Sequence, residues 1–115
     1  MQRKDLIILR KVLSEISIGL EMLGSATLDE FLNDEKLKRA VAMTVINIGE
    51  LVKNISDETR TEYRQVPWKQ IAGMRDIAAH KYQTLRMEDV FNTVKMDFPL
   101  LQAQISDILK SVENS

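Results

Sequence analysis

The sequence contains no cysteine and few glycine, proline or aromatic residues. The absence of cysteine from all 115 residues excludes disulfide bonds, thiolate metal sites and a cysteine nucleophile. Four glycines, two prolines and 5% aromatic residues favour helices over a β-sandwich. No apolar run is long enough to cross a bilayer, and the N-terminus lacks the layout of a signal peptide. We therefore expect one domain, residues 1–115, in the cytoplasm.

Charge is nearly balanced overall but unevenly distributed. A net charge of −1 argues against a protein that coats nucleic acid non-specifically. Residues 60–86 hold six basic against two acidic residues, a balance of +4. Residues 1–59 hold eight against ten (−2), and residues 87–115 hold two against five (−3). The middle is the only basic region, which fits a local site for phosphate and also an ordinary solvated face.

Apolar residues recur at steps of three and four through most of the chain, as in helices packed in a bundle. The first helix should end where Gly24 and Ser25 interrupt the pattern, and a second is predicted from about Asp34 to Ile55. A third should start at Pro67 and a fourth around Met87. No strand pattern or repeat is visible. We predict an all-α fold, an antiparallel four-helix bundle with one additional short helix.

Smaller signals indicate turns and irregularities. Thr27 is a suitable N-cap for a short turn, and Ser56 for the additional short helix. Gly49, inside the second helix, could allow close approach of another helix. Pro99 should kink or restart the last helix. The stripes predicted for the first, second and last helices are Leu6, Leu9, Leu13, Ile16, Leu20 and Leu23; Leu37, Val41, Thr44, Ile48, Leu51 and Ile55; and Val90, Val94, Phe98, Leu101, Ile105, Ile108 and Val112.

One stretch, residues 73–82, carries residues suited to chemistry. The single histidine, His80, follows Arg75 by five positions. Arginine offers phosphate a planar fork of donors, and histidine exchanges protons near neutrality. Asp76 shares a face with His80 on a continuous helix that should end near His80 to Tyr82, and could orient the imidazole or raise its pKa. Arg75 and His80 stand about 140° apart on an ideal helix, so they converge only if the helix ends near His80 or a partner subunit brings a second pair.

The same spacing also fits a purely structural arrangement. A histidine near a helix C-terminus can cap the helix, and an arginine can join a surface ion pair. The spacing alone leaves both readings open.

The motifs in order resemble a known family. Arg75 to His80 fits the Arg-x4–6-His signature of the HEPN superfamily, and His80-Lys81-Tyr82 is similar to the His-x-Tyr of its HepT-like branch. Further matches are Ile-Gly-Glu at 48–50, the Pro-Trp to Gly-Met-Arg run at 66–75 and Asp-Phe-Pro-Leu at 97–100. The resemblance covers nearly the whole chain and implies a HEPN-like bundle. Lys81 departs from the branch, where this position is often acidic; it could strengthen RNA binding or depress the pKa of His80.

The resemblance implies a metal-independent endoribonuclease. The RNA 2′-OH attacks the adjacent phosphate, giving a cyclic phosphate and a 5′-hydroxyl end. His80 would act as general base or acid, and Arg75 would stabilise the phosphorane. One histidine cannot easily serve both proton transfers, so a homodimer with two such pairs across one cleft is expected. We expect no metal and no cofactor, and the sequence has no His or carboxylate cluster at ligand spacing.

The resemblance also implies a type VII-like toxin–antitoxin pair, in which a minimal nucleotidyltransferase antitoxin transfers AMP to Tyr82. An adduct two residues from His80 would block the cleft and compete for Arg75. A half-exposed packing tyrosine is the other reading. Glu50 could be a buried partner of Arg75 or a solvated residue. Trp68 is expected in the core or an interface.

Other functions fit the same residues less well. In a non-catalytic interaction module, Arg75 and His80 would hold the dimer or a nucleotide, and the motif spacing would look the same. An antitoxin is disfavoured because the sequence lacks a nucleotidyltransferase signature. A plain structural bundle is disfavoured by the ordered family motifs.

Overall fold

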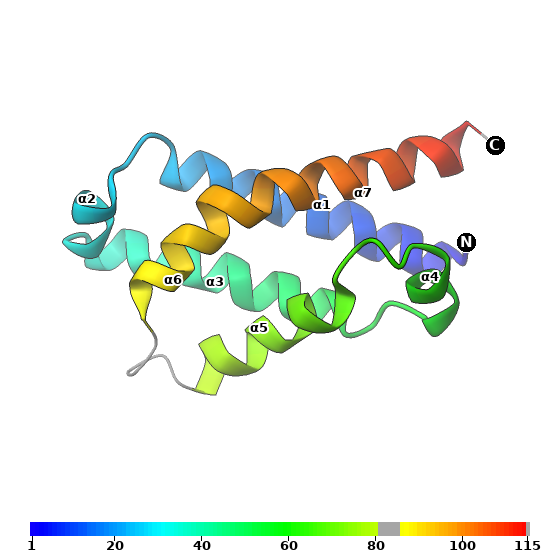
Figure 1. Cartoon of the computed structure of the whole chain (residues 1–115), viewed down its shortest axis with the longest axis horizontal. Coiled ribbons are helices and arrows are strands. Elements are labelled where there is room, and N and C mark those ends of the chain that lie inside the picture. The colour runs from blue at the N-terminus through cyan, green and yellow to red at the C-terminus, as the bar shows by residue number, and fades with distance from the viewer. Residues whose placement is uncertain (81–85, 115) are drawn as a thin grey trace.

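The computed structural model describes residues 1–80 and 86–114, with the backbone alone for residues 75–80. Within these ranges all regular structure is helical, which confirms the predicted all-α bundle. The four principal segments are α1 (Arg3–Leu23), α3 (Glu35–Val52), α5 (Trp68–His80) and α7 (Phe98–Glu113), which run alternately up and down (Figure 1). The shorter elements are α2 (Leu28–Leu32), α4 (Asp57–Glu62), α6 (Met87–Asn92) and the π-helical η1 (Thr93–Asp97). None of the described helices combines the length and apolar character needed to cross a bilayer.

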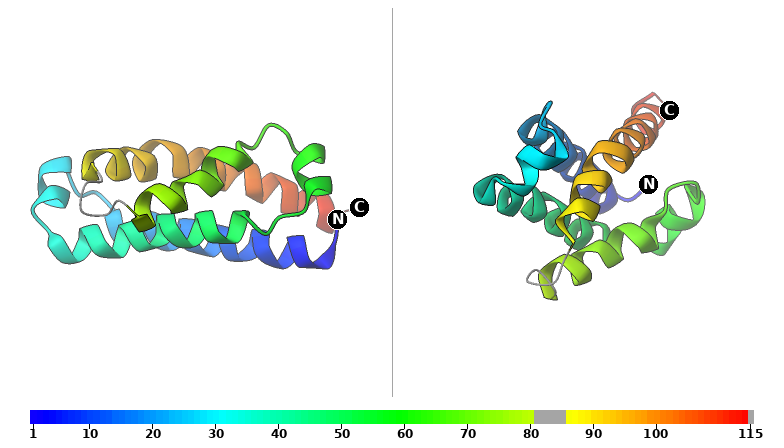
Figure 2. Two further views of the ribbon diagram at one scale, coloured as in Figure 1. Left: turned by 90° about the horizontal axis from the view of Figure 1, so that it is seen from below. Right: turned by 60° about the vertical axis from the view of Figure 1, so that its left-hand side comes forward.

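Helices α1 and α3 form the central antiparallel pair. Helix α5 packs on α3, and α7 packs on α1 (Figures 1 and 2). The bundle measures 46 × 27 × 20 Å, with both termini and α4 at one end and α2 at the other (Figure 1). Two short helices connect the principal ones. Helix α2 stands where the sequence predicted a short turn after Thr27, and α4 stands where it predicted the additional short helix after Ser56.

The buried face of α1 differs from its predicted stripe. Leu6, Leu13 and Leu20 are only partly buried, whereas Val12 is fully buried. The reason is that α1 contacts both α3 and α7, so its buried face spans the directions of both neighbours. The core consists of Ile8, Leu9, Val12, Ile16, Leu23, Phe31, Val41, Val45, Ile48, Val52, Ile55, Val66, Trp68, Ile71, Val90, Val94, Phe98, Leu101, Ile105, Ile108 and Leu109.

Helix α1 approaches its neighbours closely at Gly19. A Cβ atom there would lie 2.9 Å from Cε2 of Phe98 and 3.0 Å from the hydroxyl oxygen of Thr44. Contacts under 3.0 Å force a neighbour to move, so glycine lets α1 meet α3 and α7 closely. Gly49, where the sequence suggested a close approach, is also buried.

Helix ends follow the predicted local signals. Helix α1 stops at Gly24, whose φ of +51° suits glycine. Thr27 and Glu30 then form a reciprocal capping box: each side chain accepts a hydrogen bond from the other's backbone N–H, at 3.1 and 3.0 Å. The predicted turn is therefore stable enough to form the short helix α2.

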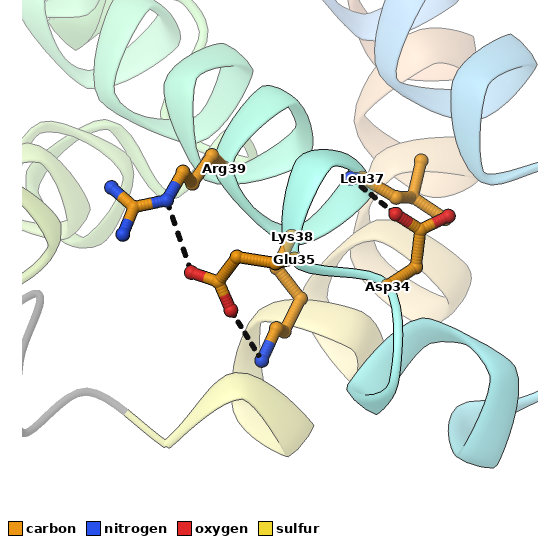
Figure 3. Close-up of polar contacts among 5 residues, drawn as sticks. All are labelled: Asp34, Glu35, Leu37, Lys38 and Arg39. Atoms are coloured by element: carbon orange, nitrogen blue, oxygen red, sulfur yellow. Dashed lines mark hydrogen bonds and ion pairs between the residues drawn. The ribbon is translucent and has the colours of Figure 1, made fainter.

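The start of α3 is fixed by its own side chains (Figure 3). Asp34 accepts a 3.0 Å hydrogen bond from the backbone N–H of Leu37, which caps the helix. Glu35 pairs with both Lys38 and Arg39 at 3.0 Å. The first turn of α3 is thus specified locally, because each of these contacts spans three or four residues.

Helix α3 ends at Val52, three residues before the predicted Ile55. The guanidinium of Arg60 donates hydrogen bonds to the carbonyls of Val52 (2.9 Å), Lys53 (3.3 Å) and Ile55 (3.2 Å). Because the helix does not continue past this point, these carbonyls lack the backbone N–H donors of a further turn. The Arg60 side chain, from α4, donates hydrogen bonds to them instead. Arg60 therefore has a structural role at the C-terminus of α3.

A buried carboxylate joins α1 to α4. Asp5 accepts hydrogen bonds from the backbone N–H of Ser56 at 3.0 Å, from the Ser56 hydroxyl, and from the Thr59 hydroxyl at 2.7 Å. Burial raises the pKa of Asp5, but the hydrogen bonds from Ser56 and Thr59 outweigh it and hold the pKa below its usual value. Ser56 also caps α4, as predicted.

Pro99 restarts the last helix, as predicted. Before it, in η1, backbone hydrogen bonds span five residues instead of the four of an α-helix, as in the bond from Phe98 N–H to the carbonyl of Thr93. Pro99 lies in the first turn of α7, where a missing N–H costs nothing.

Candidate active site on helix α5

Helix α5 carries three of the predicted site residues. Pro67 precedes it, and Trp68 anchors its start: the indole is 5% exposed and donates a 3.0 Å hydrogen bond to the carbonyl of Tyr63. Ile71, one turn later, is 3% exposed. The prediction that Trp68 belongs to the core is confirmed. This end of α5 is therefore firmly packed, and the helix runs from it to His80.

The backbone register sets the relative positions of the motif residues. Because α5 continues to His80, Asp76 and His80 are four positions apart on one helical face. Positions 75 and 80 are separated by about 140° around an ideal helix axis. Its description stops at His80, so the predicted end near His80 to Tyr82 lies at the edge of the described residues and stays a prediction. The backbone of one α5 thus places the two positions on different sides of the helix.

The other predicted residues have different outcomes. Glu50 is exposed on α3, so the prediction that it is buried is wrong, and the alternative of a solvated residue fits; whether it pairs with Arg75 lies outside the described side chains. The reason is its direction: Glu50 faces a shallow groove between α1 and α3, which Lys11 and Asn47 also line. The predictions for Lys81 and Tyr82 fall outside the described residues.

A groove follows the other side of α5. It has a volume of about 300 Å³ and lies between α5 and the segment formed by η1 and α7. Met74 lines it directly before the motif, opposite Asp97 and Leu100. Leu100 and the nearby Met96 are 63% and 72% exposed. This apolar surface was not predicted from the sequence, because neither residue lies on the predicted stripe of the last helix.

A shallow basic pocket lies at the start of α5. It has a volume of about 530 Å³ and is lined by Arg60, Arg64, Val66, Pro67, Trp68, Lys69 and Gln70. The basic balance of residues 60–86 is therefore partly concentrated in one place. Pro67 and Gln70 line both this pocket and the groove, so the two are neighbours.

Metal ligands are not gathered in the part of the chain that the structure describes. Over residues 1–80 and 86–114, apart from the side chains of 75–80, no three His, Asp or Glu side chains are placed to hold a metal ion together.

Comparison with known proteins places the chain in a family. The family model described as "Ribonuclease HepT-like" matches residues 12–108. A "Putative RNase" of Caldanaerobacter subterraneus is 34% identical over 102 residues, covering 89% of this chain and 91% of that protein. The "Probable ribonuclease HepT" of Thermococcus cleftensis is 30% identical over 102 residues, covering 85% of this chain and 93% of that protein.

One relative is longer. A "Gamma-glutamylcyclotransferase and putative RNase" of Methanocaldococcus jannaschii is 34% identical over 98% of this chain, which spans only 51% of that protein. No solved structure matches the chain. Because the family model covers most of the sequence and two relatives match over most of their own length, the chain belongs to the HepT-like ribonuclease family of the HEPN superfamily.

Proposed function

We propose that this protein is a metal-independent endoribonuclease and the toxin of a type VII-like toxin–antitoxin pair, acting in the cytoplasm. One observation carries the proposal: the Arg-x4-His motif of a ribonuclease family stands on α5, inside the only basic region of the chain. Arginine and histidine are the residue types that phosphate transfer without a metal needs.

In the proposed reaction, the RNA 2′-oxygen forms a bond to the adjacent phosphorus while the bond from phosphorus to the 5′-oxygen breaks. A general base takes the 2′-hydroxyl proton, and a general acid protonates the departing 5′-oxygen. His80 performs one of these transfers, and Arg75 stabilises the charge on the phosphorane. The products are a 2′,3′-cyclic phosphate and a 5′-hydroxyl.

A second copy of the chain supplies the second proton transfer in this proposal, because each chain has one histidine and one histidine cannot easily serve both transfers. A two-fold homodimer would supply another Arg75–His80 pair, and the separation of positions 75 and 80 on α5 is a further argument for it. The groove beside α5, with exposed Leu100 and Met96, is the surface we assign to this contact.

Control of the toxin is assigned to Tyr82. A nucleotidyltransferase antitoxin would transfer AMP from ATP to the tyrosine oxygen, with pyrophosphate leaving. The adduct, two residues from His80, adds a bulky phosphate group that occupies the cleft and competes with RNA for Arg75.

The first test is incubation of purified, unmodified protein with a mixed RNA pool in EDTA. The wild type should leave cyclic phosphate and 5′-hydroxyl ends, and His80→Ala and Arg75→Ala should each lose activity by at least 100-fold, on the order expected for an acid–base or electrostatic catalyst. Lys11→Ala, on the α1–α3 face, is the matched control. Equal inactivity of folded wild type and variants, with Tyr82 unmodified by mass spectrometry, would favour the non-catalytic binding module.

A further inference from the structure

One side of α5 forms a stripe that leads from the basic pocket toward the motif and is open at positions 69 and 73. On an ideal helix, positions 73, 76 and 80 lie within about 40° of position 69 around the axis. Lys69 is exposed, and a Cβ atom added at Gly73 would meet nothing within 4 Å. Glycine in a helix interior costs about 1 kcal/mol relative to alanine. At Gly73 this cost is not explained by packing within the described chain.

The basic pocket at the start of this stripe has two available cations. Arg64 and Lys69 are exposed, and Arg64 uses only its Nε–H on the carbonyl of Thr61, at 3.3 Å. Four further guanidinium N–H donors remain for a ligand. Arg60, the third cation, is committed to the carbonyls at the end of α3. None of the residues that line the pocket is acidic.

The charge distribution indicates a polyanion as the ligand. Residues 60–86 balance at +4, and the rest of the chain balances at −5. A polyanion is therefore attracted to the middle segment and repelled elsewhere. From Lys69 to His80 the helix rises about 17 Å, the length of about five nucleotides of a stacked strand.

We propose that single-stranded RNA lies along this stripe, with phosphates held by Arg64 and Lys69 and the strand passing over Gly73 toward His80. The inference rests on the proposed function, because it takes His80 as the site of cleavage. Arg64 and Lys69 are positioning residues, and Gly73 provides the close approach that a side chain would prevent.

Binding is measured separately from cleavage. The probe is a fluorescent single-stranded 12-mer of 2′-O-methyl RNA, which lacks the attacking hydroxyl. Arg64→Gln/Lys69→Gln should weaken binding roughly tenfold and reduce the slope of log K against log salt by about 1.4, since each phosphate contact to a single strand contributes about 0.7. Lys11→Gln/Lys36→Gln, which removes the same charge from exposed positions on α1 and α3, should bind like the wild type.

A separate substitution tests whether RNA passes over Gly73. Gly73→Gln adds a side chain where the structure has open space, so the fold should be retained. We expect at least a tenfold loss of RNA cleavage with unchanged self-association in sedimentation equilibrium. Unchanged cleavage would overturn the proposal. Altered self-association would also overturn it, because the stripe would then face a protein chain.

The outcomes separate this inference from the proposed function. If the wild type binds the probe through Arg64 and Lys69 but cleaves no RNA, the endoribonuclease proposal fails while the binding surface holds. If the wild type cleaves RNA and the double variant binds and cleaves as well as the control, the proposed RNA path along α5 is wrong while the endoribonuclease proposal stands. Equally tight binding of duplex RNA of the same length would contradict the single-strand assignment.

Discussion

The carboxylate of Asp5, in the first turn of α1, accepts a 2.7 Å hydrogen bond from the hydroxyl of Thr59, 54 positions along the chain. Both residues are fully or almost fully buried. The contact joins the start of the bundle to α4, and α4 leads through Pro67 into α5. The position of the proposed catalytic helix therefore depends in part on a carboxylate in the first helix.

Removal of this carboxylate should destabilise the fold. We expect Asp5→Ala to lower the free energy of unfolding by about 2–3 kcal/mol, because the buried hydroxyl of Thr59 and the partly buried donors of Ser56 lose a charged acceptor. Urea unfolding followed by circular dichroism measures the change. Glu21→Ala, at an exposed position of the same helix, should change it by less than about 0.5 kcal/mol. Similar losses in both variants would rule out a special role for Asp5.

The hydrogen bonds of Asp5 should also make the stability of the fold depend on pH in the acid range. Burial raises the pKa of Asp5, but hydrogen bonds from Ser56 and Thr59 leave it below 3.8. Since the folded-state pKa is depressed, its stabilisation is complete above about pH 3.8 and is lost as the pH falls through the folded-state value. The melting temperature of the wild type should therefore fall more steeply than that of Asp5→Asn as the pH is lowered below about 3.8. Parallel curves would contradict this assignment.

Two glycines should respond in opposite directions to the same substitution. Gly19→Ala places a Cβ atom 2.9 Å from Phe98 and should cost about 1–3 kcal/mol through overpacking. Gly73→Ala meets nothing within 4 Å and should stabilise α5 by about 0.5–1 kcal/mol. Thermal unfolding of both variants makes the comparison, and each serves as the control for the other. A stability loss in Gly73→Ala would show that this position is packed.

Charge placed beside the groove should weaken the proposed homodimer. Leu100→Glu replaces a side chain that is 63% exposed, so the monomer fold should tolerate it. We expect dimer association to be at least tenfold weaker by sedimentation equilibrium, with cleavage falling as monomer accumulates. Met43→Glu, at a 53% exposed position of α3, is the control. A dimer that survives Leu100→Glu would place the contact on another face.

The last helical segment was the most predictable part of the fold. Six of its seven predicted stripe residues are buried, and only Val112 is partly exposed. In α1 the apolar residues occupy several sides, including the exposed Ile7 and Ile18. The pattern alone could not show which side would face α3 and α7. The burial of Asp5 was also unpredictable, because its partners lie more than 50 positions away.

The candidate site was predictable mainly through family motifs. Spacing alone left Arg75 and His80 open to a structural reading, and the family match supports the ribonuclease assignment. The basic segment indicated a phosphate site, but only the fold shows Arg64 and Lys69 around one pocket and Arg60 engaged elsewhere. Their arrangement depends on the turn between α4 and α5, which no periodic pattern specifies.

The π-helical turn before Pro99 sets the phase of everything that follows it. Val90, Val94 and Phe98 are all buried although they are four residues apart, a spacing that would drift by about 80° around a uniform α-helix. The wider turn of η1 absorbs this drift. Because a π-helical turn holds one residue more than an α-helical turn, the loss of a single residue between 93 and 97 would close η1 to an ordinary turn and leave α7 in nearly the same orientation. The chain can therefore lose one residue here without turning the buried face of α7 away from α1, whereas the same deletion within α7 would rotate the residues after it by about 100°.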